Sequence, residues 1–135
     1  MPKKKILVVQ GGNSKERNIS LLTAKYCTKA IKKLGYITTR FDPKYSSLID
    51  LKKNNPDLIF NALHGEEGED GYVQSFFEYH KIPYTHSGVV SSMVTMNKHQ
   101  SKKIFIKNKI KTPKFYFIKN TKYSILDLKK QLNKN

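Results

Sequence analysis

The chain has 135 residues, a length that suits one domain of ordinary size with a substantial buried core. Its formal net charge of +16 raises the question of nucleic-acid binding. Only Arg17 and Arg40 are arginine, however, and the lysines are scattered along the chain, whereas phosphate and base recognition favour arginine. We therefore interpret the charge as solvated surface and expect no nucleic-acid partner.

Membrane insertion and secretion find no support in the sequence. No apolar run approaches the length of a membrane span, and the apolar run that ends at Val9 is too short for a signal peptide. The single cysteine, Cys27, excludes an internal disulfide. We expect a cytoplasmic protein with no membrane partner.

The hydrophobic pattern alternates between strand and helix along the chain. The expected strands cover residues 5–9, 36–41, 57–63, 83–85 and 114–118. The expected helices cover residues 19–34, 45–53, 72–80, 88–95, 97–108 and 123–132. This order predicts an α/β protein with an open, doubly wound, mostly parallel sheet, right-handed crossovers and helices on both faces.

Two of the helices carry a periodic apolar stripe that should face the core. In the helix over 72–80, Val73, Phe76 and Phe77 are expected to point inward. In the helix over 19–34, the expected inward face consists of Ile19, Leu22, Tyr26, Ala30, Ile31 and Leu34.

The best candidate for a domain boundary lies at residues 109–113, where Thr112-Pro113 interrupts the helical pattern. We expect a first domain over residues 1–110. Residues 111–135 are too few for a domain of their own and are expected to begin a second one.

The first glycine loop (residues 10–16) follows the first strand and leads into the first long helix. Gly11 and Gly12 allow a tight turn and a close approach to a ligand, but the dinucleotide fingerprint Gly-x-Gly-x-x-Gly is not met. Glu16 would repel phosphate, so it suits a cationic group such as a substrate ammonium. The alternative is that Glu16 caps the helix, and these residues alone do not decide between the two.

The second glycine loop (residues 64–71) follows the third strand and leads into a helix. Strand, glycine-rich loop and helix N-terminus is the geometry with which open α/β sheets bind ligands. His64 at its start is a candidate functional residue. The acids Glu66, Glu67, Glu69 and Asp70 are compatible with Mg²⁺ binding or with capping of the following helix.

Several enzyme classes are excluded by missing motifs. The chain has no Gly-x₄-Gly-Lys-Ser/Thr phosphate loop, no zinc-ligand spacing and no Gly-x-Ser-x-Gly.

Five segments carry a more specific pattern. They are Gly11-Gly12-x-Ser14-x-Glu16-Arg17 with Ser20; Asp42-Pro43; Ala62-Leu63-His64-Gly65-x-x-Gly68-Glu69-Asp70-Gly71-x-Val73-Gln74; Ile82-Pro83-Tyr84-Thr85-x-Ser87-Gly88; and Met96-x-Lys98-x-x-x-Lys102. In this order they resemble the amino-terminal part of the D-alanine–D-alanine ligases, ATP-grasp enzymes of peptidoglycan biosynthesis that serve cell-wall biogenesis and cell shape. The likeness runs from Lys5 to about Phe115.

The resemblance implies a fold and a set of residue roles. The fold would be a Rossmann-like (pre-ATP-grasp) sheet with the start of a second domain. Glu16 would be the catalytic residue that holds the ammonium of the first D-alanine, Ser20 and His64 would bind substrate, and Lys98 would bind ATP phosphates. Gly65, Gly68, Glu69, Asp70 and Gly71 would shape the site, with no metal ligand in this chain.

Three positions depart from the family pattern. Asn18 and Asn97 stand where the family usually has acids, and His86 stands where it has glycine. Asparagine keeps the shape of aspartate and loses only the charge. His86 places a bulky side chain in a turn that could require a positive φ.

The family's enzymes are about twice this length or more, with central and carboxy-terminal domains that hold most of the ATP and the Mg²⁺ or Mn²⁺. The resemblance therefore implies a part of a ligase that joins two D-alanines with ATP and acts as a homodimer, and we expect the 135 residues alone to be inactive. Two alternatives remain: a non-catalytic ligand- or partner-binding module of the same fold, and a D-alanine–D-lactate type ligase.

Overall fold

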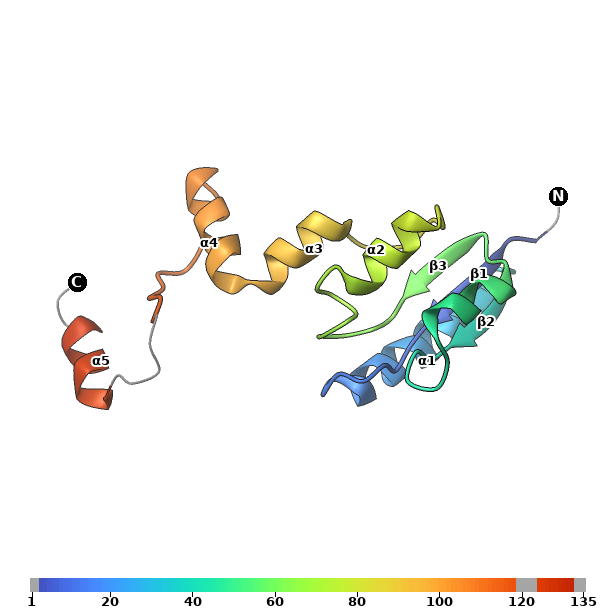
Figure 1. The fold of residues 1–135 in the computed structure, drawn as a ribbon, viewed down its shortest axis with the longest axis horizontal. Coiled ribbons are helices and arrows are strands. Elements are labelled where there is room, and N and C mark those ends of the chain that lie inside the picture. The colour runs from blue at the N-terminus through green and yellow to red at the C-terminus, as the bar shows by residue number, and fades with distance from the viewer. Residues whose placement is uncertain (1–2, 119–123, 133–135) are drawn as a thin grey trace. The chain divides into compact units, whose positions relative to one another are not determined.

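The computed structural model describes residues 3–118 and 124–132 (Figure 1). Three short parallel strands form the sheet: β1 (Lys5–Val9), β2 (Ile37–Phe41) and β3 (Leu58–Asn61). Their order is β2-β1-β3, with Leu7 of the central strand paired with Thr39 on one side and Ile59 on the other. The predicted α/β class with an open parallel sheet is confirmed.

A fourth segment pairs with the sheet beside β3. The backbone N–H of Ile59 donates to the carbonyl of Pro83 at 2.8 Å, and the N–H of Thr85 donates to the carbonyl of Ile59 at 3.0 Å. The predicted strand over 83–85 is thus reduced to one parallel bridge between Ile59 and Tyr84. Pro83 has no N–H to offer, which limits how far the ladder can extend.

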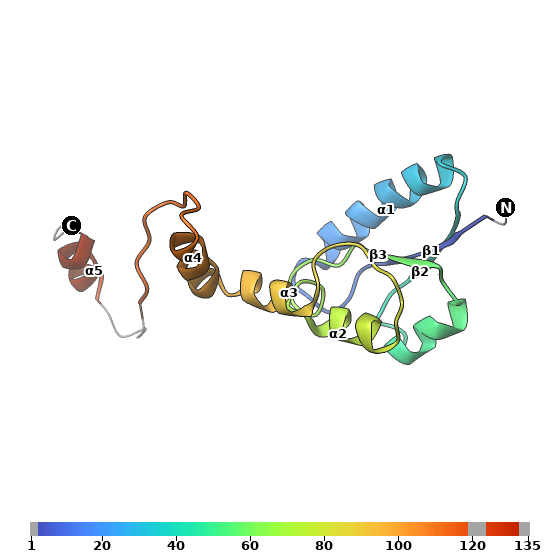
Figure 2. The ribbon, with the colours of Figure 1, turned by 90° about the horizontal axis from the view of Figure 1, so that it is seen from above.

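Helices cover both faces of the sheet, as predicted (Figure 2). Helix α1 (Arg17–Lys33) lies on one face, and α2 (Tyr72–Tyr79) lies on the other with the 3₁₀-helix η1 (Leu48–Asn54). The larger core cluster lies on the α2 and η1 side and consists of Leu7, Val9, Phe41, Leu51, Ile59, Leu63, Val73 and Phe77. The predicted inward positions of α2 are confirmed: Val73 and Phe77 are buried, and Phe76 packs against them.

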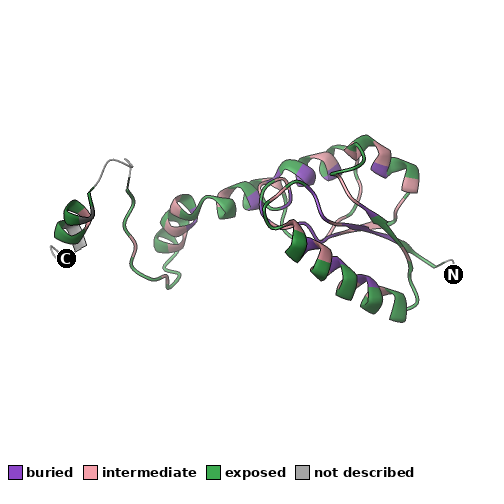
Figure 3. Ribbon diagram, turned by 90° about the horizontal axis from the view of Figure 1, so that it is seen from below, coloured by how far each residue is buried: buried purple, intermediate pink, exposed green. Residues whose placement is uncertain are grey.

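The predicted inward face of α1 is wrong. Its buried residues are Ser20, Ala24 and Thr28, whereas Ile19, Leu22, Tyr26 and Leu34 of the predicted stripe are all at least half exposed (Figure 3). Ile31 alone of that stripe packs against the core, beside Val8, Ala24 and Ala62. Small side chains let the helix backbone lie close to the sheet, so the contact surface uses them rather than the larger apolar residues one step around the helix.

The remaining elements are α3 (Val89–Met96), α4 (Lys98–Lys107) and α5 (Ile125–Leu132). The segment expected as a helix over 45–53 is the 3₁₀-helix η1. The strand expected over 114–118 is not formed, and residues 111–118 have no regular secondary structure. The strands β1, β2 and β3 all lie within residues 1–101, so this segment has no strand to pair with among the described residues of its own unit. The first residue of the helix expected over 123–132 lies outside the described residues.

The chain divides into two compact units, residues 1–101 and residues 102–135. In the second unit, Lys102 Nζ donates to Thr112 Oγ1 at 2.8 Å and to the carbonyl of Pro113 at 3.1 Å. A domain boundary near residue 110 stays a prediction. In the described part of the chain, no helix is long and apolar enough to cross a membrane.

Candidate functional site

Both glycine loops leave the carboxyl edge of the sheet, and a buried serine joins them. Ser20 Oγ accepts a hydrogen bond from the N–H of Gly11 and donates one to the carbonyl of Ala62, each at 2.7 Å. Gly11 and Gly12 have φ of +79° and +72°, the left-handed region that glycine tolerates. Because Ser20 has no exposed surface and both its hydrogen-bonding roles are filled, its place favours holding the two loops together rather than contacting a ligand.

An ion pair holds the first glycine loop to the end of β2. Arg17 reaches both carboxylate oxygens of Asp42, at 3.1 and 2.7 Å, and also donates to the carbonyl of Gly12. Asp42 in turn accepts the N–H of Gly12 and that of Lys44. Burial by itself would raise the pKa of Asp42, but the hydrogen bonds from Arg17 and the two amides outweigh it, so the pKa is lowered.

Glu16 stands at the start of α1 with its carboxylate exposed. Its side chain makes no capping hydrogen bond, and among the described residues it forms no ion pair. It lies beside the second glycine loop, since a Cβ atom placed on Gly65 would come within 3.2 Å of Glu16 Oε1. The structure therefore brings an uncompensated carboxylate of the first loop against the second loop. Capping by the side chain, the alternative left open by the sequence, is not observed.

Two buried amides hold the second glycine loop. The carbonyl of Gly68 accepts hydrogen bonds from Asn61 Nδ2 at 2.9 Å and from Gln74 Nε2 at 2.7 Å. Asn61 Oδ1 accepts the N–H of Leu63, so the strand end and the loop share one network. Gly68 itself packs against Leu63 so closely that a Cβ atom would lie 2.4 Å from that side chain.

Asp70 shapes the same loop from within. Its carboxylate accepts the N–H of Glu67 at 2.9 Å and that of Tyr72 at 3.0 Å. Gly71, with φ of +97°, follows and starts α2. The described residues contain no group of three or more His, Cys, Asp or Glu that could hold a metal ion.

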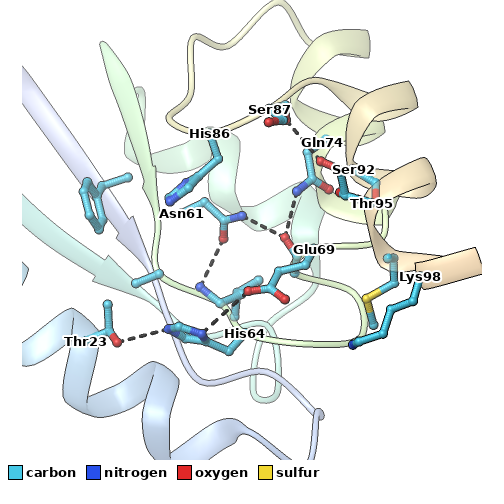
Figure 4. A pocket seen from close by; sticks show the side chains of 15 residues that line it. Thr23, Asn61, His64, Glu69, Gln74, His86, Ser87, Ser92, Thr95 and Lys98 are labelled. Atoms are coloured by element: carbon cyan, nitrogen blue, oxygen red, sulfur yellow. Dashed lines mark hydrogen bonds and ion pairs between the residues drawn. The ribbon is translucent and has the colours of Figure 1, made fainter. Parts of the chain in front are cut away.

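A pocket of about 410 Å³ opens between the second glycine loop and α3 (Figure 4). His64 lies on its wall, with Nε2 3.0 Å from Thr23 Oγ1 and Nδ1 3.6 Å from Glu69 Oε1. The amide oxygen of Gln74 is buried there without a hydrogen-bond partner. The pocket is lined by Thr23, Phe60, Asn61, Ala62, Leu63, His64, Gly68, Glu69, Gln74, His86, Ser87, Ser92, Thr95, Met96 and Lys98.

Lys98 is the first residue of α4 and is exposed at this pocket. Asn97 precedes it and caps the helix, because its Oδ1 accepts the N–H of Gln100 at 3.1 Å. Asparagine thus retains the shape of the acid that the family usually has. His86 does have a positive φ, +82°, as its place in a glycine turn led us to expect.

The sequence-predicted residues fall into two groups. His64, Gly68, Glu69 and Lys98 line the pocket. Glu16 is not among the lining residues and lies beside Gly65, and the other predicted residues that do not line the pocket are Ser20, Gly65, Asp70 and Gly71. Sequence reasoning missed Thr23 and Asn61. Asn61 could have been predicted as a site residue, because it is a polar residue within an apolar strand. No feature of the sequence marks Thr23 as a site residue.

An open parallel α/β domain with two glycine loops at the carboxyl edge of its sheet defines a class of small-molecule-binding domains. A family profile described as D-ala D-ala ligase N-terminus matches residues 39–87. The chain is 52% identical to a D-alanine–D-alanine ligase of Pelagibacter ubique over 132 residues, 98% of this chain and 43% of that protein. It is 48% identical over 113 residues to that of a Wolbachia of Brugia malayi, covering 84% of this chain and 33% of that one.

A solved structure gives the same result. The D-alanine–D-alanine ligase of Bacillus anthracis complexed with ATP superposes with a TM-score of 0.75 and 33% identity, over 94% of this chain and 44% of that one. The chain is therefore homologous to the amino-terminal part of the D-alanine–D-alanine ligases. It spans less than half the length of these two curated relatives.

Proposed function

We propose that this chain supplies the substrate-binding amino-terminal part of an ATP-dependent D-alanine–D-alanine ligase. The reaction converts ATP and two D-alanines into D-alanyl-D-alanine, ADP and phosphate, in the cytoplasm, for peptidoglycan precursors, and the whole protein would be a homodimer. The observation that carries the proposal is the exposed, unpaired carboxylate of Glu16 beside the second glycine loop. The 52% identity to the Pelagibacter ligase supports the assignment.

Glu16 would bind the ammonium group of the first D-alanine. A carboxylate without an ion-pair partner among the described residues is free to accept charge-assisted hydrogen bonds from a cation. Ser14 Oγ accepts the backbone N–H of Glu16 at 3.1 Å, so the loop that presents the carboxylate is anchored. Ser20, being fully buried, would act indirectly by keeping the loops in register.

Lys98 would contact the phosphates of ATP. Its ammonium is exposed at the N-terminus of α4, where the helix dipole also favours an anion. Bound ATP supplies the phosphoryl group that activates the first carboxylate. The Mg²⁺ or Mn²⁺ that accompanies it would be held by the part of the ligase beyond this chain.

On this proposal, the 135-residue chain alone neither couples D-alanine nor hydrolyses ATP. One lysine contact to phosphate gives too little free energy to offset the cost of association. Micromolar ATP with Mg²⁺ should leave the melting temperature unchanged, and a clear rise would contradict this assignment of the nucleotide site.

The proposal is tested with a chimera in which residues 1–110 replace the matching part of the Pelagibacter ligase. We expect ATP-dependent formation of D-alanyl-D-alanine, and Glu16→Gln should reduce it by at least tenfold because the ammonium contact is lost. Asp50→Asn, which also neutralises a carboxylate but in η1, where Asp50 is partly exposed and paired with Lys53, is the control and should not change the rate. Undiminished activity of Glu16→Gln would refute its role, and coupling with D-lactate instead of D-alanine would refute the substrate assignment.

A further inference from the structure

The imidazole of His64 is held from two sides by groups of the same compact unit (Figure 4). Thr23 Oγ1 of α1 lies 3.0 Å from Nε2, and Glu69 Oε1 of the second glycine loop lies 3.6 Å from Nδ1. The first distance is that of a hydrogen bond, and the second is a longer electrostatic contact. Thr23 is thus the closer and firmer of the two partners.

Of the two partners, only Glu69 favours one position of the proton in the neutral imidazole, because the hydroxyl of Thr23 can either donate or accept. A carboxylate has no proton to give, so the nitrogen facing Glu69 is favoured as N–H over a lone pair that the carboxylate would repel. With the proton on Nδ1, Nε2 is an acceptor. The hydroxyl of Thr23 then donates to it. A free histidine side chain in water prefers the opposite tautomer, so the arrangement is imposed by the fold.

Both partners rest on rigid supports. Ser20 lies one turn before Thr23 on α1 and is hydrogen-bonded to the carbonyl of Ala62, two residues before His64. On the other side, Glu69 follows Gly68, whose carbonyl is fixed by Asn61 and Gln74. The distance between Thr23 and the ring therefore does not depend on a flexible surface segment.

We infer that Thr23 is a positioning residue that occupies Nε2 of His64, so that Nδ1–H is the donor offered to an anionic group of a ligand. Glu69 is half exposed and only loosely placed against Nδ1, so a carboxylate or phosphoryl oxygen can take its position. Lys98 lines the same pocket and adds positive charge there. The functional part of this inference rests on the proposed function, whereas the tautomer does not.

The tautomer is measured by two-bond ¹H–¹⁵N correlation spectra of the ¹⁵N-labelled 135-residue chain. The spectra are recorded at about pH 8, above the pKa of imidazole in model peptides. We expect His64 to be mainly the Nδ1–H tautomer in the wild type and in Thr23→Ser. Thr23→Val keeps the size of the side chain and removes the hydroxyl, but the carboxylate of Glu69 still faces Nδ1, so the Nδ1–H tautomer should persist in this variant. His80, at the end of α2, is the internal control.

A wild-type His64 that is mainly Nε2–H overturns the inference. Glu69→Gln is the variant that tests the origin of the tautomer. The glutamine amide can accept from or donate to Nδ1, so it favours neither tautomer of His64. Both tautomers should then be seen in the spectra. An unshifted Nδ1–H tautomer in Glu69→Gln would overturn the derivation from the carboxylate.

The functional consequence is measured in the chimera. Thr23→Val should raise KM for D-alanine roughly tenfold with a smaller change in kcat, the size expected from one misdirected charge-assisted hydrogen bond. Thr23→Ser should stay near the parent. An unchanged KM in Thr23→Val overturns the positioning role. A chimera that makes no dipeptide refutes the proposed function, and the tautomer of His64 then stands or falls by the spectra alone.

Discussion

The two glycine loops meet at one edge of the sheet but are held by different chemistry. The first is held by the Arg17–Asp42 ion pair, because Arg17 donates to the carbonyl of Gly12 and Asp42 accepts the N–H of Gly12. The second is held by neutral amides, those of Asn61 and Gln74, which converge on the carbonyl of Gly68. An ionic hold depends on protonation and a neutral one does not, so the Arg17–Asp42 pair and the amides on Gly68 should respond differently to pH.

We expect the largest loss of stability from the addition of a single methyl group to the second glycine loop, at Gly68. Gly68→Ala places a Cβ atom 2.4 Å from that of Leu63 and 3.0 Å from its backbone carbonyl carbon, so the loop or the strand end must shift. We expect a loss of about 3 kcal/mol in the free energy of unfolding, measured with urea. Gly35→Ala is the control, since that position has open space and only a positive φ, and it should cost about 1 kcal/mol. Equal losses in the two variants would show that steric contact at Gly68 is unimportant.

The ionic hold of the first loop is tested with Asp42→Asn. At pH 7 we expect a loss of about 1 kcal/mol, because the partly exposed guanidinium of Arg17 loses its counter-charge and water screens part of the pair. The folded pKa of Asp42 lies below its ordinary value, so its contribution is present above about pH 4 and is lost as the pH falls through the folded pKa. The variant and wild type should therefore converge in acid.

Gln74→Leu is the comparison for that experiment. It removes one of the two donors to Gly68, and its cost should be the same at pH 7 and in acid, because no charge takes part. Urea unfolding of both variants and the wild type at pH 7 and in acid gives the loss in free energy of unfolding for each variant at each pH. A pH-dependent cost for Gln74→Leu, or a constant one for Asp42→Asn, would reverse the contrast between the loops.

His86 tests backbone strain near the second loop. Its φ of +82° is unfavourable for any side chain, and its ring contacts with Phe60 offset part of this cost. We expect His86→Gly to be more stable than His86→Ala by about 1 kcal/mol, because both lose the ring and only alanine keeps the strain. Thermal unfolding of the two variants gives the difference. Indistinguishable melting temperatures would mean that the turn adjusts its backbone freely.

The smallest expected effect lies on the second-loop side and appears in alkali. Burial, and then the hydrogen bond to Glu78 at 2.6 Å, raise the pKa of Tyr84 to about 12. Because the folded pKa is raised, the contribution of Tyr84 is present below about pH 10 and is lost as the pH rises through about 12. Tyr84→Phe should lose less than about 1 kcal/mol at pH 7 and approach the wild type above pH 10. A variant whose deficit persists at the highest pH would place the effect in packing instead.

The sequence was sufficient for the fold class because strong local signals agree with one another. In an α/β protein, the apolar run at Lys5–Val9 predicts a buried strand, and glycines after apolar stretches predict the ends of helices. The spacing of apolar residues in α2 predicts which of its side chains face the core. The apolar face of α1 was assigned wrongly, because periodicity identifies a stripe but not the face that packs. Which face packs is decided by how closely the helix approaches the sheet, and Ser20 and Ala24 permit that approach.

The candidate site was predictable only in part. Glycines and charges in loops marked Glu16 and His64, whereas Lys98, on a helix, was marked only by the resemblance to the ligase family. Thr23 is a surface-type residue on a helix, and only the fold brings it to His64 from 41 positions away. The strand expected over 114–118 failed for a related reason: a strand is defined by its partner, and its local sequence does not supply one.

The double hydrogen bond of Ser20 has a consequence for how the loops open. The N–H of Gly11 and the carbonyl of Ala62 are bridged by a single oxygen atom. Separation of the second loop would break the bond to Ala62 and leave that of Gly11 intact, because Ser20 belongs to α1, directly after the first loop. Amide hydrogen exchange at Gly11 should therefore report opening of the first loop alone, so the two loops can be followed separately.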